Sequence, residues 1–209
     1  MAHIKGGKLI TFEGIDGCGK STHLALAQKF LTEKRLSVKV LREPGSTEVA
    51  ERIRAILLDR KAKMSPATEL LLYEACRADM VEKQIAPLLR KGHIILCDRF
   101  YDSTTAYQGY GRKLDIKMVR NLHAVATGGI KPDLTIVFDI DVATGMSRLG
   151  KNLDRMESES HPFFKRVRAG FLEIARKENR RVKVVDASRP IVIVFEDVKK
   201  ILTRKLDLS

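Results

Sequence analysis

Short apolar segments and longer amphipathic segments alternate along the chain. The short ones are rich in aliphatic and β-branched residues and predict five strands, over 9–13, 38–42, 94–98, 134–139 and 182–185. Between them, apolar positions recur at helical spacing and predict helices over 21–34, 47–58, 66–89, 116–127, 142–149, 163–177 and 194–205. Strands that alternate with helices in this way are typical of βαβ units, which build a parallel sheet between layers of helices.

The predicted strand at 94–98 is apolar without alternation, as expected for a central strand that helices cover on both faces. No internal repeat, low-complexity tract or long linker interrupts the pattern, and 209 residues suffice for one domain with its own core. We therefore expect one α/β domain spanning 1–209, in which helices wrap a five-stranded parallel sheet to form three layers. Ligands bind to such sheets outside the carboxyl ends of the strands.

A glycine-rich segment lies where the first predicted strand meets the first predicted helix. Residues 14–21 match the pattern G-x-x-x-x-G-K-[ST], which binds polyphosphate when it stands between a strand and a helix. Backbone N–H groups of such a loop and the positive end of the helix face the phosphates. We expect Lys20 to reach the β- and γ-phosphates and the Ser21 hydroxyl to hold Mg²⁺. The residues predicted to bind the nucleoside triphosphate are Gly14, Ile15, Asp16, Gly17, Cys18, Gly19, Lys20, Ser21 and Thr22.

The composition is that of an ordinary soluble globular protein, with 44% hydrophobic and 31% charged residues. The first eight residues lack the apolar core of a signal peptide, and no apolar run approaches the ~20 residues of a membrane span. The cysteines Cys18, Cys76 and Cys97 are scattered, as expected for free thiols in a reducing compartment and not for a disulfide framework. We therefore expect a cytoplasmic protein with no membrane partner.

The net charge of +13 raises the question of a nucleic-acid partner. The basic residues are dispersed, and aromatic residues make up only 6% of the chain, which is little material for stacking on bases. An enzyme that handles two anionic nucleotides also benefits from a positive field. The sequence favours small anionic substrates over nucleic acid.

Other motifs distinguish the classes of protein that share this phosphate loop. The chain has no Asn-Lys-x-Asp segment of the kind with which regulatory GTPases bind the base, and the acid that ends the strand at 94–98 is followed by Arg99. Small-molecule kinases need an acceptor pocket and a cationic segment that closes over it. The charge-dense segment at about 148–160, between two predicted helices, is suited to be that lid. A solvated surface loop is the alternative interpretation.

Six segments occur in an order that resembles the thymidylate kinase family of nucleoside monophosphate kinases. They are Phe12-Glu13-Gly14-Ile15-Asp16-Gly17 with Gly19-Lys20-Ser21-Thr22, Arg42-Glu43-Pro44-Gly45, Tyr73 with Arg77, Asp98-Arg99-Phe100, the run 103–109, and Asp154-Arg155 with Glu157. The resemblance covers about residues 8–175. It implies a P-loop NTPase fold with a short lid and an enzyme that uses ATP and Mg²⁺ to phosphorylate dTMP.

The resemblance also implies a dTMP site. Arg42 and Arg99 would hold the acceptor phosphate, which suits guanidinium groups because they bind it bidentately and stay charged. The Glu43–Pro44 bond is often cis in the family and would aim Arg42 into the pocket. Tyr73 would stack on thymine, and Arg77, one helical turn later, would bind the carbonyl edge of the base. The implied dTMP site comprises Asp16, Arg42, Pro44, Tyr73, Arg77, Arg99, Ser103, Thr104, Tyr107 and Gln108, of which Thr104 and Gln108 read the base and Tyr107 packs beneath the sugar.

The implied catalytic residues are Lys20, Asp16, Arg42, Arg99 and Arg155. Asp16 would position phosphates and metal and not act as a base, because phosphoryl transfer needs little covalent chemistry from the protein. Ser21, Asp16 and Glu157 are the implied metal site, and Arg148 would add to the ATP site. Arg155 would neutralise developing negative charge when the lid closes.

The chain departs from the family pattern at three places. Ser46 stands where a second glycine is common, and Cys76 precedes Arg77 where Asp or Ala is usual. The lid is short and has few arginines, and the phosphate loop contains no arginine. Arg148, Lys151 and Arg155 are therefore three alternatives for the catalytic cation.

The expected activity is the formation of dTDP from dTMP and ATP, by a homodimer packed through the apolar helices at 66–89 and 116–127. One alternative is a kinase of the same group that accepts dUMP or other monophosphates. Another, from a different class, is a P-loop switch or ATPase that binds nucleotide and has no small acceptor.

Overall fold

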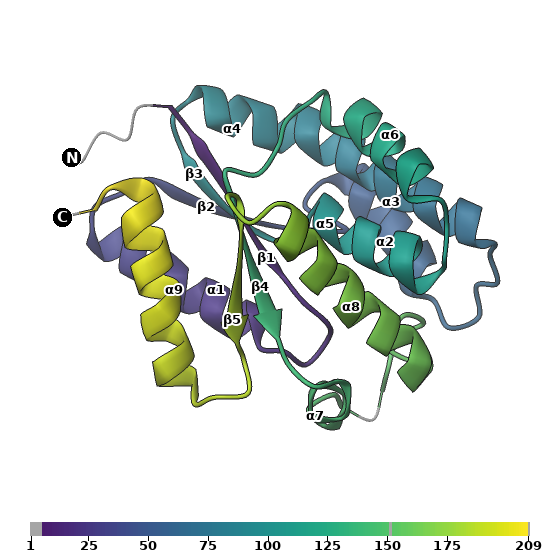
Figure 1. Cartoon of the computed structure of the whole chain (residues 1–209). Coiled ribbons are helices and arrows are strands. Elements are labelled where there is room, and N and C mark those ends of the chain that lie inside the picture. Colours follow the sequence, from purple (N-terminus) through teal and green to yellow (C-terminus); the bar gives the residue numbers. More distant parts are fainter. Residues whose placement is uncertain (1–5, 151, 209) are drawn as a thin grey trace.

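The computed structural model describes residues 6–150 and 152–208. In it, one parallel sheet has the strand order β2-β3-β1-β4-β5 (Figure 1). Its strands are Lys8–Glu13 (β1), Val38–Arg42 (β2), Ile94–Asp98 (β3), Leu134–Asp139 (β4) and Val182–Asp186 (β5). Every predicted strand is confirmed to within one residue at each end.

Helices cover both faces of this sheet, so the predicted three-layer α/β architecture is confirmed. Figure 1 shows α1 and α9 on one side of the sheet and α3, α5 and α8 on the other. The helical segments are α1 (Lys20–Glu33), α2 (Glu48–Leu58), α3 (Pro66–Met80), η1 (Val81–Ile85), α4 (Ala86–Arg90), α5 (Tyr101–Thr104), η2 (Thr105–Gly111), α6 (Ile116–Thr127), α7 (Val142–Ser147), α8 (His161–Lys177) and α9 (Ile191–Leu206).

The helix predicted at 66–89 is divided by the π-helical segment η1. Its start is as expected: the Ser65 hydroxyl accepts the Thr68 N–H at 3.1 Å and Pro66 occupies the first turn. Pro87 explains the interruption, because it has no N–H to donate and its ring clashes with the preceding turn of a regular helix. The wider turns of η1, which directly precede α4, give that ring room.

The segment α5–η2 has no counterpart among the predicted helices. Its sequence mixes hydroxyl residues with two glycines and shows no apolar repeat at helical spacing. Tertiary packing holds it: a Cβ on Gly111 would lie 2.7 Å from the Phe163 ring on α8, so only glycine permits this close approach. The segment matters because it carries four of the implied site residues.

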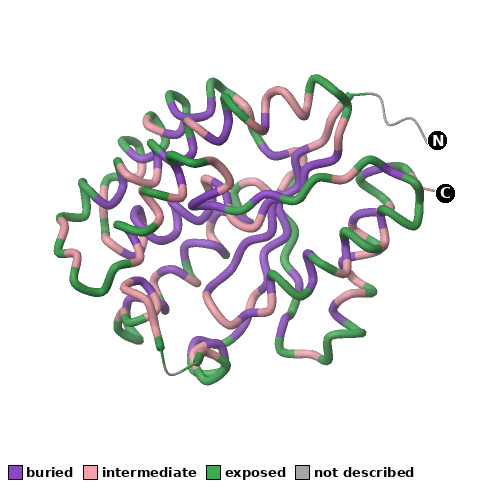
Figure 2. Tube along the Cα trace, turned by 180° about the vertical axis from the view of Figure 1, so that it is seen from behind, coloured by how far each residue is buried: buried purple, intermediate pink, exposed green. Residues whose placement is uncertain are grey.

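The core lies between the sheet and the two helical layers. Figure 2 shows the central strands as buried and the outward helix surfaces as exposed. In β3, residues 94–97 are all buried, as the uninterrupted apolar run predicts. Asp98 at the end of β3 is paired in register with Phe12 of β1 and Arg42 of β2. The carboxyl ends of these strands therefore bring the predicted site segments together.

Candidate active site

The phosphate loop connects β1 to α1, as predicted. Gly14, Gly17 and Gly19 all have positive φ, and a Cβ on Gly17 would lie 2.0 Å from the Gly145 carbonyl oxygen, so this turn requires glycine. Lys20, the first residue of α1, folds back over the loop and donates to the carbonyl oxygens of Gly14 (3.4 Å) and Ile15 (3.2 Å). The lysine ammonium thus lies within the loop that is suited to hold phosphates.

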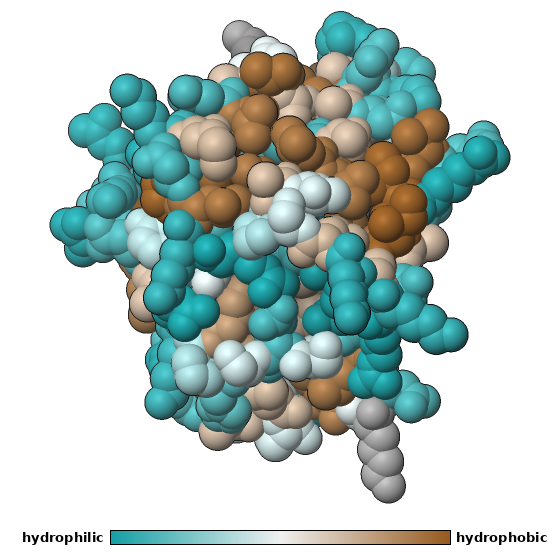
Figure 3. Space-filling model, turned by 90° about the vertical axis from the view of Figure 1, so that its right-hand side faces the viewer, coloured by the Kyte–Doolittle hydropathy of each residue, from teal (hydrophilic) through white to brown (hydrophobic). Residues whose placement is uncertain are grey.

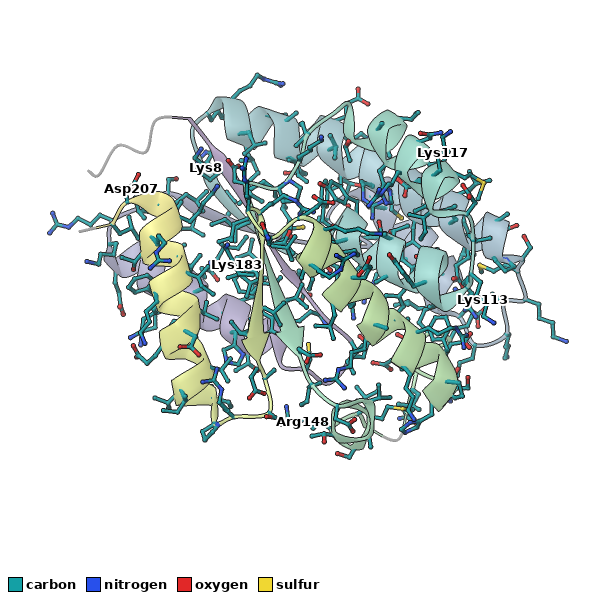
Figure 4. The ribbon with its side chains drawn as sticks, in the orientation of Figure 1. Lys8, Lys113, Lys117, Arg148, Lys183 and Asp207 are labelled. Atoms are coloured by element: carbon teal, nitrogen blue, oxygen red, sulfur yellow. The ribbon has the colours of Figure 1, made fainter. Side chains whose placement is uncertain are left out.

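Two of the candidates for the catalytic cation, Arg148 and Arg155, lie in different places. The Arg148 guanidinium, at the end of α7, donates to the Gly17 carbonyl oxygen at 3.5 Å, and Figure 4 shows this residue on the side to which the strand arrows point. Arg155 instead donates to the Leu57 carbonyl oxygen at 2.7 Å and pairs with the buried Glu69 carboxylate. Lys151 lies outside the described residues. In this arrangement the Arg155 guanidinium is paired with a carboxylate of α3.

A cavity of about 220 Å³ lies beside the phosphate loop at the carboxyl ends of β1, β2 and β3. All the residues of the implied dTMP site line it: Asp16, Arg42, Pro44, Tyr73, Arg77, Arg99, Ser103, Thr104, Tyr107 and Gln108. Lys20, Ser21 and Glu157 line the same cavity, whereas Arg155 is absent from its walls. The fold therefore gathers residues from 16 to 157 around one hollow.

Arg99 occupies the junction between this cavity and the phosphate loop. Its guanidinium donates to the Gly14 carbonyl oxygen (2.9 Å) and to the Ser103 hydroxyl (3.0 Å), and it pairs with Asp16. The Tyr107 hydroxyl donates to the second oxygen of Asp16 at 2.9 Å. Burial alone would raise the pKa of Asp16, but the charges of Arg99 and Lys20 outweigh it and lower that pKa to about 2. Asp16 is therefore an anion held between two cations.

Arg42 enters from the end of β2 on the opposite wall. Its guanidinium bonds to both carboxylate oxygens of Glu51, each at 2.9 Å, and the Glu43–Pro44 bond is cis as expected. Ser46, the departure from the family pattern, has φ 73; its hydroxyl accepts the Arg42 N–H at 2.9 Å. Its own N–H donates to Glu51 at 2.8 Å, so polar contacts stabilise the left-handed turn that a glycine would adopt freely.

Arg77 is locked in the wall on which the base is expected. It is only 1% exposed, donates twice to Glu43 (3.1 and 2.7 Å) and once to the Thr104 hydroxyl (2.8 Å), and pairs with Glu74 at 2.8 Å. Burial raises the pKa of Glu43 to about 7, although Arg77 opposes the shift. Cys76 plays no part in this network, because its thiol points to the Ala50 carbonyl oxygen on α2. The carboxylates of Glu43 and Glu74 thus fix Arg77.

Several polar residues in or beside the cavity are not among the site residues predicted from the sequence. The Asp98 carboxylate accepts the Ser21 hydroxyl at 2.8 Å; its place at the end of β3 predicts that it meets the phosphate loop, but no role there was assigned to it. Arg54 lines the cavity and donates to the Pro44 carbonyl oxygen at 2.8 Å, but nothing in the pattern of α2 marks it. Glu69 accepts from Gln108 at 2.8 Å and holds Arg112 and Arg155, a contact that sequence spacing does not reveal.

The oxygen atoms near the loop fit a magnesium ion that arrives with a nucleotide. Ser21 and Asp98 offer two hard ligands, and Asp16 lines the same cavity. Mg²⁺ keeps several waters and is usually bound by one or two carboxylates together with substrate phosphates. Within residues 6–150 and 152–208, no cluster of three or more Asp, Glu, His or Cys side chains would hold a metal alone. The donor set therefore suits a metal shared with substrate.

The class of the protein follows from the strand order, the glycine loop that opens α1 and the arginine-lined cavity beside that loop: it is a P-loop phosphotransferase. The family pattern described as thymidylate kinase matches residues 12–198. The chain belongs to the thymidylate kinase family.

Similar proteins span nearly the whole chain. The thymidylate kinase of Thermoanaerobacter sp. (strain X514) is 43% identical over 201 residues, covering 96% of this chain and 99% of the relative. That of Kosmotoga olearia is 45% identical over 193 residues, covering 91% and 93%. The crystal structure of thymidylate kinase from Ehrlichia chaffeensis superimposes with a TM-score of 0.77 at 36% identity, covering 94% of this chain and 99% of that one. Along the described part of the chain, no helix has the length and apolarity needed to cross a membrane.

Proposed function

We propose that this protein transfers the γ-phosphoryl group of ATP to dTMP, which forms ADP and dTDP, and that Mg²⁺ accompanies the ATP. The observation that carries the proposal is one cavity in which the phosphate-loop lysine meets two arginines and an aromatic wall. A P-loop protein without a small acceptor needs no pair of arginines in addition to the cation of its phosphate loop. The geometry therefore favours a kinase over a switch or an ATPase.

The acceptor phosphate is assigned to Arg42 and Arg99. Both guanidiniums line the cavity and are occupied by carboxylates, Glu51 and Asp16, that hold them in place until a phosphate competes for their N–H groups. Arg54 adds a third positive charge to the same wall. Arginine suits this task because its planar fork binds phosphate bidentately and stays charged.

The donor phosphates are assigned to residues 14–22, with Lys20 placed to stabilise the charge that develops on the transferring phosphoryl group. Mg²⁺, when bound by Ser21, Asp98, Asp16 and the phosphates, supplies further charge neutralisation. Glu157, whose carboxylate accepts the Asp154 N–H at 2.9 Å, lines the cavity on the lid side and is assigned to metal-bound water. Catalysis then consists mainly of holding two phosphates in line.

Thymine is assigned to the wall formed by Tyr73, Arg77, Thr104 and Gln108. Tyr73 lines the cavity, and Arg77 is paired with two carboxylates, so its position does not depend on the substrate. A rigid polar group of this kind discriminates between bases through the hydrogen bond that a wrong base leaves unmade. Tyr107, whose hydroxyl is held by Asp16, is assigned to the sugar.

We propose further that residues 1–209 form one catalytic domain and that the segment at about 148–160 is its lid. In support, the Arg155 N–H donates to the Leu58 carbonyl oxygen at the end of α2, and Asp154, Met156 and Glu157 border the cavity. Three buried free thiols, Cys18, Cys76 and Cys97, favour a reducing, cytoplasmic setting.

A homodimer packed through α3 and α6 is also proposed. Figure 3 shows apolar side chains gathered on the face that includes these helices. Leu71 on α3 and Met118 and Val125 on α6 are exposed, Val125 by 81%, which is unusual for a face that meets only water. A Val125→Glu variant that stayed dimeric by light scattering would contradict this arrangement.

The test is a coupled assay of ADP release with dTMP, dUMP, dCMP, dGMP and AMP as acceptors. We expect release to depend on an acceptor and to be fastest with dTMP. Equal use of several monophosphates would replace the proposal by a kinase of broad specificity, and ATP hydrolysis that no acceptor stimulates would refute a kinase altogether.

A further inference from the structure

Glu13 has a fully buried carboxyl group that takes no part in the proposed reaction. It is the last residue of β1 and directly precedes the phosphate loop. Among the described residues it forms no ion pair; its Oε1 accepts the Phe100 N–H at 2.7 Å and its Oε2 contacts the Ser103 hydroxyl at 2.5 Å. Burying a carboxyl group costs free energy unless the group is hydrogen-bonded. The two groups to which Glu13 bonds therefore indicate why a carboxyl group lies here.

Both partners of Glu13 flank Arg99. Phe100 follows Arg99 in sequence, and Ser103 accepts a hydrogen bond from the Arg99 guanidinium at 3.0 Å. Arg99 has φ 71, a left-handed conformation that is unfavourable for a residue with a side chain. Its own N–H is held by the Phe12 carbonyl oxygen at 3.0 Å, next to Glu13 in the strand. The end of β1 therefore braces this turn on its backbone side and on its side-chain side.

We propose that Glu13 is a positioning residue of the acceptor site, which holds the Arg99 turn through the Phe100 N–H and sets the direction of the Ser103 hydroxyl proton. The proposal rests on the assignment of Arg99 to the acceptor phosphate. Arg99 touches substrate in that assignment, and Glu13 acts only through Arg99 and Ser103.

The protonation state of Glu13 decides where the hydroxyl proton of Ser103 points. The Ser103 oxygen already accepts from Arg99 and carries one proton of its own. If Glu13 is ionised, Ser103 must donate to it and has no proton left for the cavity that it lines. If Glu13 is protonated, the carboxyl donates to Ser103, and the serine proton is free to bind a phosphate oxygen of the acceptor.

The surroundings of Glu13 favour the protonated form. Burial, with a further contribution from the Asp102 carboxylate on α5, raises the pKa of Glu13 to about 8, against the lowering effects of Ser103, Arg99 and the Phe100 N–H. Cys97 on β3 also interacts with Glu13, and Asp16, Asp98 and Tyr107 lie, like Glu13, close to Arg99. At neutral pH the carboxyl thus supplies a donor to Ser103 and places no negative charge beside the acceptor phosphate.

Two substitutions separate the two parts of the proposal. Glu13→Gln imitates the protonated carboxyl, because its carbonyl oxygen accepts from Phe100 and its amide N–H donates to Ser103. Glu13→Leu removes both contacts. The matched control is Thr11→Val, which removes a buried hydrogen bond to Thr135 (2.7 Å) from the same strand but touches no site residue. For each variant, kcat and the KM values of dTMP and ATP are measured from about pH 7 to 9.

We expect the wild-type kcat/KM for dTMP to fall as the pH rises through this range, since ionised Glu13 withdraws the serine proton. Glu13→Gln should keep the KM of dTMP within about threefold of wild type at neutral pH and lose this fall, because a glutamine does not ionise. Glu13→Leu should raise the KM of dTMP by about tenfold or more and leave that of ATP within about threefold, as lost hydrogen bonds in the acceptor site predict. Thr11→Val should change neither KM.

A folded Glu13→Leu variant with an unchanged KM for dTMP would overturn the positioning role. If that variant does not fold, Glu13→Gln decides: a pH dependence equal to that of the wild type, or a flat wild-type profile, overturns the proton arrangement. Arg99→Ala distinguishes this failure from failure of the assigned function. If Arg99→Ala leaves the KM of dTMP unchanged, the acceptor assignment itself is wrong; if it raises that KM while the Glu13 variants do not, only the role of Glu13 is lost.

Discussion

Replacing Glu69 by glutamine tests how the acceptor pocket and the lid are joined. The Glu69 carboxylate is almost fully buried and bonds to Gln108 at 2.8 Å, to Arg112 twice at 2.9 Å, and to Arg155. Gln108 belongs to η2, Arg112 is the first residue after η2, and Arg155 belongs to the proposed lid. One negative charge thus ties three segments that are distant in the sequence.

The loss of stability expected for Glu69→Gln follows from the two arginines that lose their carboxylate partner. Arg112 and Arg155 have side chains only 17% and 12% exposed, so each would be left largely desolvated; Arg112 alone keeps a second carboxylate, Glu159. Removing one partner of a buried ion pair lowers the free energy of unfolding by about 3–5 kcal/mol. We expect a value of about 3 kcal/mol here, because the side-chain carbonyl of glutamine still accepts a hydrogen bond from the arginines. For a domain of this size the melting temperature falls by about 2–4 °C per kcal/mol, hence by about 6–12 °C in total.

Differential scanning calorimetry at neutral pH measures this shift, and Glu48→Gln is the matched control. Glu48 pairs with Arg52 on α2 with both side chains about 80% exposed (80% and 78%), and exposed pairs of this kind contribute little. The control should melt with the wild type. A Glu69→Gln variant that melts within a degree or so of the Glu48→Gln variant would refute the claim that this carboxylate holds the pocket and the lid together.

Three other predictions concern catalysis and pH. Lys20→Ala should lower kcat by about 100-fold or more without changing the melting temperature by more than a few degrees, since it removes charge at the transferring phosphoryl group; a variant with more than about a tenth of wild-type activity would contradict that role. Arg148→Ala should raise the KM of ATP, and Arg155→Ala should chiefly lower stability, because Arg148 contacts the phosphate loop and Arg155 contacts Glu69; the opposite division would show that the lid moves before transfer. The pKa values of Glu43 and Glu13 are raised in the folded state from 4.5 to about 7 and about 8, so the native state holds more protons than the unfolded state in between, and the stability that they contribute is lost as the pH rises through these values. Urea unfolding should therefore show stability falling from about pH 5 to 9, and less steeply in Glu13→Gln.

Periodicity and the loop motif predict the frame of this fold well, for clear physical reasons. Strands buried on both faces are continuous apolar runs, and β3 was located to the residue. The glycine loop is defined by local backbone requirements that only glycine meets, such as the approach of Gly17 to Gly145. Residues at the carboxyl ends of neighbouring strands, Arg42 and Asp98, must then lie side by side.

The features that could not be predicted from the sequence depend on contacts between segments that are distant in the chain. The α5–η2 segment has no helical repeat, because its helix is held by α8 and by polar contacts of the site and not by an apolar stripe. Its site residues were therefore accessible only through the family resemblance. The pairing of Arg155 with Glu69, 86 positions away, leaves no trace in local spacing. The same holds for Glu13, whose partners belong to a different βαβ unit.

A crystal structure with dTMP and a non-hydrolysable ATP analogue tests the central claim most directly, namely that two nucleotides meet in one cavity. The account predicts the dTMP phosphate within hydrogen-bond distance of both Arg42 and Arg99, with the γ-phosphate analogue at Lys20 and in line with the acceptor oxygen. A dTMP phosphate bound elsewhere, while Arg42 stays on Glu51 and Arg99 on Asp16, would contradict it.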